Sequence, residues 1–317
     1  MKDKSAPSIS IIIRTLNEAK YLPECLDKVK HQLYAGYVEV IIVDSGSIDE
    51  TVEIAKDFGA KIVHITKSEF TFGRSLNLGC KVSSGELLVF LSAHCIPCNS
   101  SWLSDLVSPL IDRRSVYSYG RQIPREGISK FSEGMVYKKY YPPTSSIPQT
   151  GYFCNNANAA ILRTTWSKHG FNEKLTGLED IELAMRLVSS DDTVSYVASS
   201  VVEHIHEECW SRIKIRYERE AVALANIEPN LSLSLVEALR LFVFAVGHDL
   251  AFLNSKTLTH VTEIIKYRAC QYYGSFVGSR ISKNRLQMMR QEYFYPKSRD
   301  NIVKLKASNH SKSSDKS

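Results

Sequence analysis

The sequence lacks any long uninterrupted apolar run and any sign of a disulfide framework. No stretch of about 18 apolar residues occurs in its 317 residues, which argues against a membrane-spanning helix. The short apolar run at residues 9–13 ends at Arg14, so we expect no signal peptide. The seven cysteines are odd in number and scattered, which is typical of free, buried thiols in a reducing compartment. We therefore expect a cytoplasmic protein.

The first two thirds of the chain also lack excess basic charge. The net charge is +6, but residues 1–203 carry 22 basic and 23 acidic side chains. Residues 204–296 carry 12 and 9, and residues 297–317 carry 6 and 2. Because a nucleic-acid-binding domain is expected to be basic over its folded surface, we predict no nucleic-acid partner.

What the sequence does contain is a regular series of short apolar runs. Runs rich in β-branched residues cover 8–13, 38–43, 61–65 and 87–91 without strict alternation, which is typical of strands buried on both faces. Helical patterns lie between them at 18–34, 49–58 and 74–82. We predict an α/β fold with a mixed sheet and helices on both faces. Ser47 and Glu50 are spaced as a capping box that opens the second helix, and Gly59 closes it.

Polar loops follow three of these predicted strands and should meet at one rim of the sheet. No GxGxxG or Walker sequence occurs there, which argues against a dinucleotide or P-loop site. A nucleotide could still bind through side chains that accept hydrogen bonds from its base and ribose. The candidates at this rim are Thr15, Asn17, Glu18, Asp44, Ser45, Ser92 and His94.

The motifs in these loops resemble those of family 2 glycosyltransferases of the GT-A fold. They are Thr-Leu-Asn-Glu at 15–18, Val-Asp-Ser-Gly-Ser-Ile-Asp at 43–49 and Leu-Glu-Asp-Ile-Glu at 178–182. The stretch 72–79 and the pair His204/His206 further resemble the rhamnosyltransferase-like branch. The resemblance covers roughly residues 8–220, and a weaker resemblance is found at residues 267–278.

This resemblance implies transfer of a sugar from a nucleotide-diphosphate donor to an acceptor hydroxyl, with inversion at the anomeric carbon. It implies Asp180 as the catalytic base, a lipid-linked or oligosaccharide acceptor, and a growing bacterial surface glycan of capsule or lipopolysaccharide type as product. The sugar would be a hexose or a deoxyhexose. We expect the nucleotide sugar to be bound by Thr15, Asn17, Glu18, Asp44, Ser45, Arg74, Asn77, Ser92 and Asn158.

Asp180 lies in the first turn of a helix predicted over 178–189. There we expect Ile181, Ala184, Met185 and Val188 to form the inward stripe, with Glu179, Glu182 and Arg186 on the outer face. Asp180 falls at the margin of this stripe, where partial desolvation raises a carboxyl pKa toward a useful base. The alternative is an acidic residue that complements the helix dipole.

The chain departs from the family where an Asp-x-Asp pair usually binds the metal, because it reads Ser92-Ala93-His94. A histidine is a plausible metal ligand, and we expect His94 and His206 beside a divalent metal, Mg²⁺ or Mn²⁺, or beside the diphosphate itself. His204 is the alternative to His206, and one of the two then only packs or caps. The departure also leaves open a catalytically inactive module that binds a glycan or a nucleotide sugar.

Three regions are predicted: a catalytic domain at 1–220, a helical region at 221–296 and a disordered basic tail at 297–317. The apolar stretch 231–253 is interrupted by charged residues, and basic and apolar residues interleave at 280–290. This pattern favours docking on an anionic membrane surface, peripheral at the inner face of the plasma membrane. A partner helix or an ordinary solvated face remains the alternative.

Overall fold

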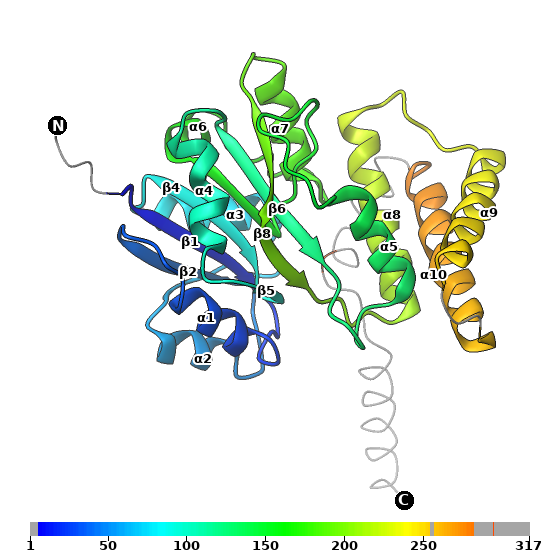
Figure 1. Cartoon of the computed structure of the whole chain (residues 1–317), viewed down its shortest axis with the longest axis horizontal. Helices are drawn as coiled ribbons and strands as arrows, with labels where there is room; N and C mark the ends of the chain where they lie inside the picture. The colour runs from blue at the N-terminus through cyan, green and yellow to red at the C-terminus, as the bar shows by residue number, and fades with distance from the viewer. Residues whose placement is uncertain (1–5, 254–256, 282–293, 295–317) are drawn as a thin grey trace, which may run out of the picture.

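The fold is organised around one mixed β-sheet (Figure 1). The computed structural model describes residues 6–253, 257–281 and 294. Within these residues, eight strands lie in the order β3-β2-β1-β4-β7-β6-β8-β5. They are β1 (Ile9–Thr15), β2 (Val38–Asp44), β3 (Lys61–His64), β4 (Leu87–Ser92), β5 (Cys95–Pro97), β6 (Tyr117–Ile123), β7 (Asn158–Leu162) and β8 (Val194–His204).

Strands β1 to β4 form the parallel half of the sheet, and their bounds agree with the predicted runs to within two residues. β1 pairs in parallel with β2 and β4, and β2 pairs in parallel with β3. Successive side chains of β1 point to opposite faces. Ile11 and Ile13 therefore enter one hydrophobic core while Ile12 enters the other, which is why the run is apolar throughout.

The other half of the sheet mixes strand directions. β7 is antiparallel to β4 and β6, β6 is parallel to β8, and β5 is antiparallel to β8. The pairing of β5 with β8 sets Cys95 opposite His204. This register brings the loop after β4 beside the end of β8, although more than 100 residues separate them in the chain.

Helices cover both faces of this sheet, as predicted. α1 and α4 pack Leu22 and Trp102 into one core, whereas α3 and α7 pack Leu76 and Leu183 into the other. The helices are α1 (Leu22–Lys30), α2 (Thr51–Phe58), α3 (Phe72–Val82), α4 (Trp102–Ile111), α5 (Phe131–Tyr140), α6 (Arg163–His169), α7 (Glu179–Val188), α8 (Trp210–Ile227), α9 (Leu235–Ala251) and α10 (Leu258–Gly278).

The predicted capping box of the second helix is wrong. α2 begins at Thr51, and the Ser47 hydroxyl donates to Asp44 Oδ1 at 2.5 Å instead of capping a helix. The strand-end carboxylate accepts the hydroxyl because it lies three residues back in the same tight loop. The predicted stop is confirmed, since Gly59 follows the helix with φ 85°.

The C-terminal helices α8, α9 and α10 stand beside α5, away from the parallel half of the sheet (Figure 1). The predicted division at residue 220 falls inside α8, so the helical region of the structure begins at Trp210. A buried ion pair holds this region together: both Nε and Nη2 of Arg268 on α10 lie 2.8 Å from Asp249 on α9. Ser132 on α5 donates to the same aspartate at 2.6 Å. The predicted tail at 297–317 lies outside the described residues.

No helix in the described ranges is long and apolar enough to cross a membrane. All seven cysteines fall in these ranges and all are free thiols. Four of them are buried, Cys98 and Cys209 are exposed, and Cys270 is intermediate.

Candidate active site

The carboxyl ends of β1, β2 and β4 lie side by side and form the floor of the candidate site. Thr15 is in register with Asp44, and Arg14 is in register with Ser92. This is the position at which open α/β sheets bind ligands. The structure thus brings together the three polar loops that the sequence places after these strands.

Asp44 organises the loop that follows β2. It is 2% exposed. Its carboxylate accepts hydrogen bonds from the Thr15 hydroxyl at 3.1 Å, the Gly46 amide at 3.0 Å and the Ser47 amide at 3.1 Å. Ser45 is also buried and donates its hydroxyl to the Thr15 carbonyl at 3.1 Å. Asp44 therefore fixes the shape of the rim against which a nucleotide would lie.

The loop after β1 is locked to this rim through Asn17. Asn17 has a left-handed φ of 56°, which an asparagine tolerates better than most residues. The Asn17 Oδ1 accepts a hydrogen bond from the Ile48 backbone amide at 2.8 Å, and the Asn17 backbone amide donates to Ser47 Oγ at 2.9 Å. The next residue, Glu18, donates its amide to Thr51 Oγ1 at 2.7 Å, which leaves its carboxylate directed at His94.

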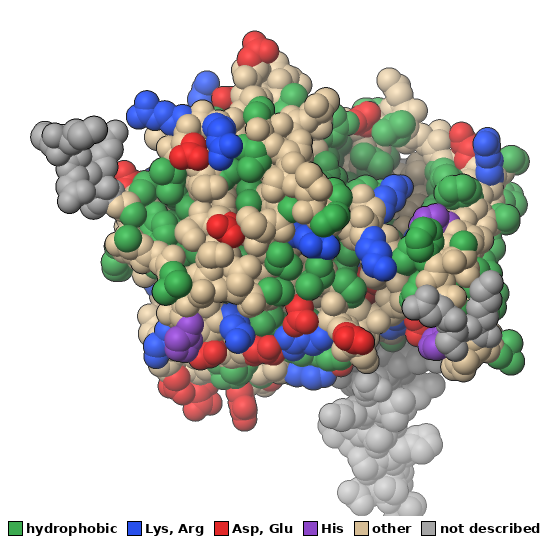
Figure 2. Space-filling view, viewed as in Figure 1, with side chains coloured by type: hydrophobic (Ala, Val, Ile, Leu, Met, Phe, Trp, Pro, Cys, Tyr) green, Lys and Arg blue, Asp and Glu red, His purple; other side chains and the backbone are tan. Residues whose placement is uncertain are grey.

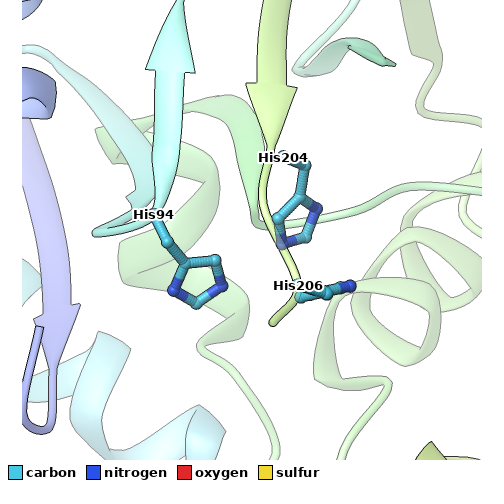
Figure 3. A group of neighbouring side chains, drawn as sticks. All are labelled: His94, His204 and His206. Atoms are coloured by element: carbon cyan, nitrogen blue, oxygen red, sulfur yellow. The ribbon is translucent and has the colours of Figure 1, made fainter. Parts of the chain in front are cut away.

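Three histidines gather beyond this loop, as Figure 3 shows. The ring centroids of His204 and His206 lie 4.1 Å apart, and that of His94 lies 5.2 Å and 5.6 Å from them. One ligand nitrogen from each ring lies within 4.8 Å of the others. The His94 Nδ1 is 3.0 Å from Glu18 Oε1, so the cluster is directly joined to the candidate nucleotide loop.

Charges around the cluster decide the protonation of two groups in it. Burial by itself lowers the pKa of His94, but the Glu18 carboxylate outweighs it and the net effect is a raised pKa. Burial and the neighbouring His206 and His94 lower the pKa of His204 well below its ordinary value. His204 is therefore a neutral imidazole near pH 7.

Asp180 lies at the centre of the buried face of α7 and not at its margin, so the predicted stripe is displaced. The buried positions of α7 are Glu179, Asp180, Leu183, Ala184 and Leu187, whereas Ile181 and Met185 are only half-buried. Periodicity located the helix correctly but not its rotation, because apolar residues occupy both candidate stripes.

The surroundings of Asp180 raise its pKa to about 7. Burial is the main cause, the Glu179 carboxylate adds to it, and backbone N–H groups and Arg14 oppose it. The Asp180 Oδ2 accepts a hydrogen bond from the backbone amide of Asn156 at 2.8 Å, and Oδ1 accepts one from the backbone amide of Ile181 at 2.8 Å. Each oxygen keeps a further lone pair, so the carboxylate can still take a proton.

Glu179 was predicted on the outer face of the helix, and this is wrong. Its side chain is 5% exposed and lies 3.2 Å from Arg14 Nη1. The partner comes from the end of β1, 165 residues away, so no local pattern could reveal it. The pair ties the α7 turn that carries Asp180 to the rim that carries Thr15.

Three predicted contact residues have their side chains engaged within the protein. Arg74 lies on α3, 3.2 Å from Glu69. The side-chain amide of Asn77 forms hydrogen bonds with the Trp166 indole, with the backbone of Phe171 and with the Glu173 carboxylate. It therefore holds the segment before α7. Asn158 is fully buried, where it accepts from Trp102 Nε1 at 2.9 Å and donates to the Ser200 carbonyl at 3.0 Å. Ser92 is half-buried at the end of β4.

The sequence analysis missed the residues that support the histidines. Gln122 on β6 lies 2.6 Å from His204 Nδ1, and Glu133 on α5 lies 2.8 Å from His206 Nδ1. Arg216 on α8 pairs with Glu133 at 2.7 Å and with Glu208 at 2.8 Å.

The sheet is mixed, with one parallel half, and polar loops form a rim at the carboxyl ends of its parallel strands. This arrangement defines the class of protein as one with the GT-A fold. The structure superposes with a TM-score of 0.63 on a mannosyltransferase from Pyrobaculum calidifontis determined with GDP-Man and Mn²⁺, over 88% of this chain and 89% of that one at 17% identity. It superposes at 0.53 on glucosyl-3-phosphoglycerate synthase from Mycobacterium tuberculosis, over 71% and 81% of the two chains at 19% identity.

Sequence comparison gives the family. Residues 10–170 match glycosyl transferase family 2, and the chain belongs to that family. It is 30% identical over 210 residues to the O-antigen chain rhamnosyltransferase RfbN of Salmonella typhimurium, which covers 62% of this chain and 66% of that protein. It is 28% identical over 178 residues to the O-antigen chain rhamnosyltransferase WbaN of Salmonella anatum, covering 53% and 56%. The chain thus spans just under two thirds of the length of RfbN and a little over half of the length of WbaN. The predicted resemblance to the rhamnosyltransferase-like branch is confirmed.

Proposed function

We propose that the protein is an inverting glycosyltransferase that moves a hexose or deoxyhexose from a nucleotide-diphosphate donor to a hydroxyl of a growing bacterial surface glycan. The observation that carries this proposal is Asp180, a buried carboxylate whose pKa is raised to about 7, held beside the rim of a family 2 sheet. A base with such a pKa combines a useful deprotonated fraction with a strong affinity for the acceptor proton.

In the proposed reaction, Asp180 takes the proton of the acceptor hydroxyl while its oxygen attacks the anomeric carbon. The bond from that carbon to the diphosphate oxygen breaks, and the nucleoside diphosphate leaves with the bonding electrons. The Asn156 and Ile181 amides hold the two carboxylate oxygens in place. Asp180 therefore needs no reorientation before it accepts the proton, and Arg14 sets its charge environment from the rim.

The nucleotide part of the donor would bind the rim formed by Thr15, Asn17, Glu18 and Asp44. Asn17 and Glu18 have exposed or half-buried side chains, whereas Thr15 and Asp44 are buried beneath them. We therefore assign direct contact to the first two and to the exposed backbone at Gly46. Asp44 would hold this backbone in shape through the hydrogen bonds described above.

A divalent metal, Mg²⁺ or Mn²⁺, would lie beside the diphosphate at His94 and His206. The two rings and His204 place ligand nitrogens within 4.8 Å of one another, and the donor diphosphate would supply the oxygen ligands that these ions prefer. When bound, the ion would neutralise charge that develops on the departing diphosphate. The relative from Pyrobaculum calidifontis is described with Mn²⁺ and the donor GDP-Man, which supports a metal in this proposal.

The test is turnover of a panel of UDP, dTDP, GDP and CDP sugars, with release of nucleoside diphosphate as the signal. We expect one donor class to react and Asp180→Asn to abolish transfer while donor binding in a thermal-shift assay persists. Asp57→Asn, an exposed carboxylate on α2, is the matched control and should keep full activity. Retained turnover by Asp180→Asn rejects this residue as the base.

A catalytically inactive binding module is the second candidate, and the replacement of Asp-x-Asp by Ser92-Ala93-His94 is the observation that favours it. Such a module would show a thermal shift with a nucleotide sugar or a glycan, with neither hydrolysis nor transfer under any metal. Measuring binding and turnover on the same protein sample separates the two functions.

The C-terminal helices would dock the enzyme on an anionic membrane and so bring it to a lipid-linked acceptor. The outward side of α9 exposes Val236, Val243 and Phe244 to 76%, 66% and 72%, and hydrophobic side chains are visible along this outer edge in Figure 2. An apolar groove of about 190 Å³ lies between α9 and α10, lined by Phe242 and Tyr272 among others. The basic segment predicted at 280–290 lies outside the described residues from 282 onward.

A further inference from the structure

The three histidines are held in a way that leaves the same nitrogen of each ring available. His94 Nδ1 lies 3.0 Å from Glu18 Oε1, His204 Nδ1 lies 2.6 Å from Gln122 Oε1, and His206 Nδ1 lies 2.8 Å from Glu133 Oε1. In each pair the oxygen accepts a proton from Nδ1. This hydrogen bond engages Nδ1, so Nε2 is the nitrogen of each ring that is directed away from its oxygen partner.

This pattern is characteristic of metal-ligating histidines in general. A ligating imidazole almost always donates its second nitrogen to a carboxylate or carbonyl oxygen, which orients the ring and increases its basicity. Here the three oxygens come from a loop, from strand β6 and from helix α5. Three separate elements therefore converge on the rings, which a packing role alone does not require.

The charges around the rings suit a cation. The carboxylates of Glu18, Glu133 and Glu208 lie around the cluster. Among the described residues, Arg216 is the only arginine that pairs with two of them, Glu133 and Glu208.

A neighbouring set, Glu133, His206 and Glu208, is also close enough to hold an ion. Arg216 already pairs with both carboxylates of this set, at 2.7 Å and 2.8 Å. An ion there would have to displace a guanidinium. The three rings carry no such competitor in the described part of the chain, and they are therefore the better site.

We propose that His94, His204 and His206 form a three-imidazole site that binds a nitrogen-preferring divalent metal such as Zn²⁺ or Co²⁺ in the absence of nucleotide. Imidazole ligands favour these ions over Mg²⁺, which prefers oxygen. Zn–N bonds of about 2.0–2.1 Å need nitrogens about 3.4 Å apart, so small rotations of the rings would close the site. Its place beside the donor diphosphate rests on the proposed function, whereas binding itself is measured without a donor.

The experiment is equilibrium dialysis of the chelator-treated full chain against Zn²⁺, Co²⁺ or Mg²⁺ without nucleotide, with bound metal measured by elemental analysis. We expect one equivalent of Zn²⁺ or Co²⁺ and no saturable Mg²⁺. The Co²⁺ form should show visible absorption bands, which report nitrogen coordination independently of activity. His94→Gln and His204→Gln should each lower the affinity at least tenfold.

Two variants control this result. His31→Gln removes an exposed histidine whose ring contacts only its own helix turn, and it should bind as the wild type does. Gln122→Ala removes the oxygen that fixes the His204 ring, together with a hydrogen bond to Asn155, and it should lower the affinity about 10- to 100-fold. Because His204 is buried, circular dichroism must show that each variant is folded, and the half-buried His94 provides the variant least at risk.

The proposal is overturned if the wild type binds none of these ions without nucleotide, or if binding survives both His94→Gln and His204→Gln. Sugar transfer that depends on Mg²⁺ alone, with no Zn²⁺ bound, would overturn this inference and leave the proposed function standing. If the three rings bind stoichiometric Zn²⁺ but the protein turns over no donor, the proposed function is overturned and this inference stands.

Discussion

Arg14 Nη1 lies 3.2 Å from Glu179 Oε1, and this pair joins the end of β1 to the helix turn that carries Asp180. Both side chains are largely removed from solvent, at 20% and 5% exposure. The same guanidinium lies over the Phe72 ring at 4.8 Å and donates to the Phe72 carbonyl at 3.3 Å. The proposed nucleotide-binding rim and the proposed base are thus parts of one connected structure.

Removing Arg14 should therefore affect both stability and the base. Arg14→Gln leaves the buried Glu179 carboxylate without its partner, at a cost of about 3 kcal/mol. It also removes a charge that lowers the Asp180 pKa, so the pH profile of transfer should move to higher pH. Urea unfolding and the pH dependence of kcat/KM measure the two effects.

Two further variants test this interpretation. Arg114→Gln breaks an exposed pair with Asp112 and should change stability by less than about 1 kcal/mol. The double variant Arg14→Gln/Glu179→Gln removes both charges and should recover most of the lost stability. An Arg14→Gln protein as stable as the wild type would contradict the role of this pair.

The raised pKa of Asp180 makes a prediction about stability and pH. The carboxyl has a pKa of 3.8 when unfolded and about 7 when folded, so folding favours its protonated form. The stability it contributes is complete below pH 3.8 and is lost as the pH rises through 7. Relative to Asp180→Asn, the wild type should lose roughly 2–3 kcal/mol between pH 5 and pH 8.

The measurement is the difference in unfolding free energy between wild type and Asp180→Asn at the two pH values. The amide of the variant must face a backbone N–H at Asn156 or Ile181, which adds a cost that does not depend on pH. Only the change in the difference is therefore diagnostic. A difference that is the same at pH 5 and pH 8 would show that Asp180 titrates normally.

Helices α8 and α10 approach closely at Gly278. A Cβ atom there would lie 2.2 Å from the Glu218 carbonyl oxygen and 2.9 Å from Ala221 Cβ. Gly278→Ala should therefore destabilise the protein by about 1–3 kcal/mol. Gly247→Ala is the matched control, because a Cβ in that α9 position meets nothing within 4 Å, and it should stabilise the helix by about 0.5–1 kcal/mol. Equal effects of the two changes in urea unfolding would argue against this packing.

The proposed membrane docking predicts that α9 lies in the interface. At 17 residues it is about 26 Å long, and Arg240 is the exposed basic residue among its outward apolar side chains. Phe244→Asp should reduce co-sedimentation with anionic phosphatidylglycerol vesicles several-fold, because it places a carboxylate in the apolar boundary. Leu33→Asp, which changes an equally exposed leucine far from α9, should have no effect.

Neutral phosphatidylcholine vesicles are the lipid control, and wild-type binding to them should be weaker. Docking on a membrane would be rejected if the wild type fails to bind anionic vesicles. If Phe244→Asp instead changes the mass of the protein in light scattering, a second copy of the chain covers α9.

Sequence patterns predicted the parallel half of the sheet well, because each of its strands carries a short apolar run and the central strands β1 and β4 are buried on both faces. They located α7 but misplaced its buried face. Apolar residues occupy both candidate stripes of that helix, so its rotation depends on Arg14 and the sheet, which are remote in the chain. Asn77 and Asn158 were predicted to contact donor, yet their amides satisfy buried backbone and indole groups whose positions only the fold supplies.

The sequence by itself determined the family, the positions of the first four strands along the chain and the loops that hold Asp44 and Asp180, because these depend on short local patterns. The tertiary structure decided which side chains meet. His94 faces His204 and His206 because β5 pairs with the end of β8, and Gln122 and Glu133 fix two of these rings from β6 and α5. Such contacts span 73 to 112 residues along the chain. They arise from strand pairing and helix packing, which no local pattern of residues encodes.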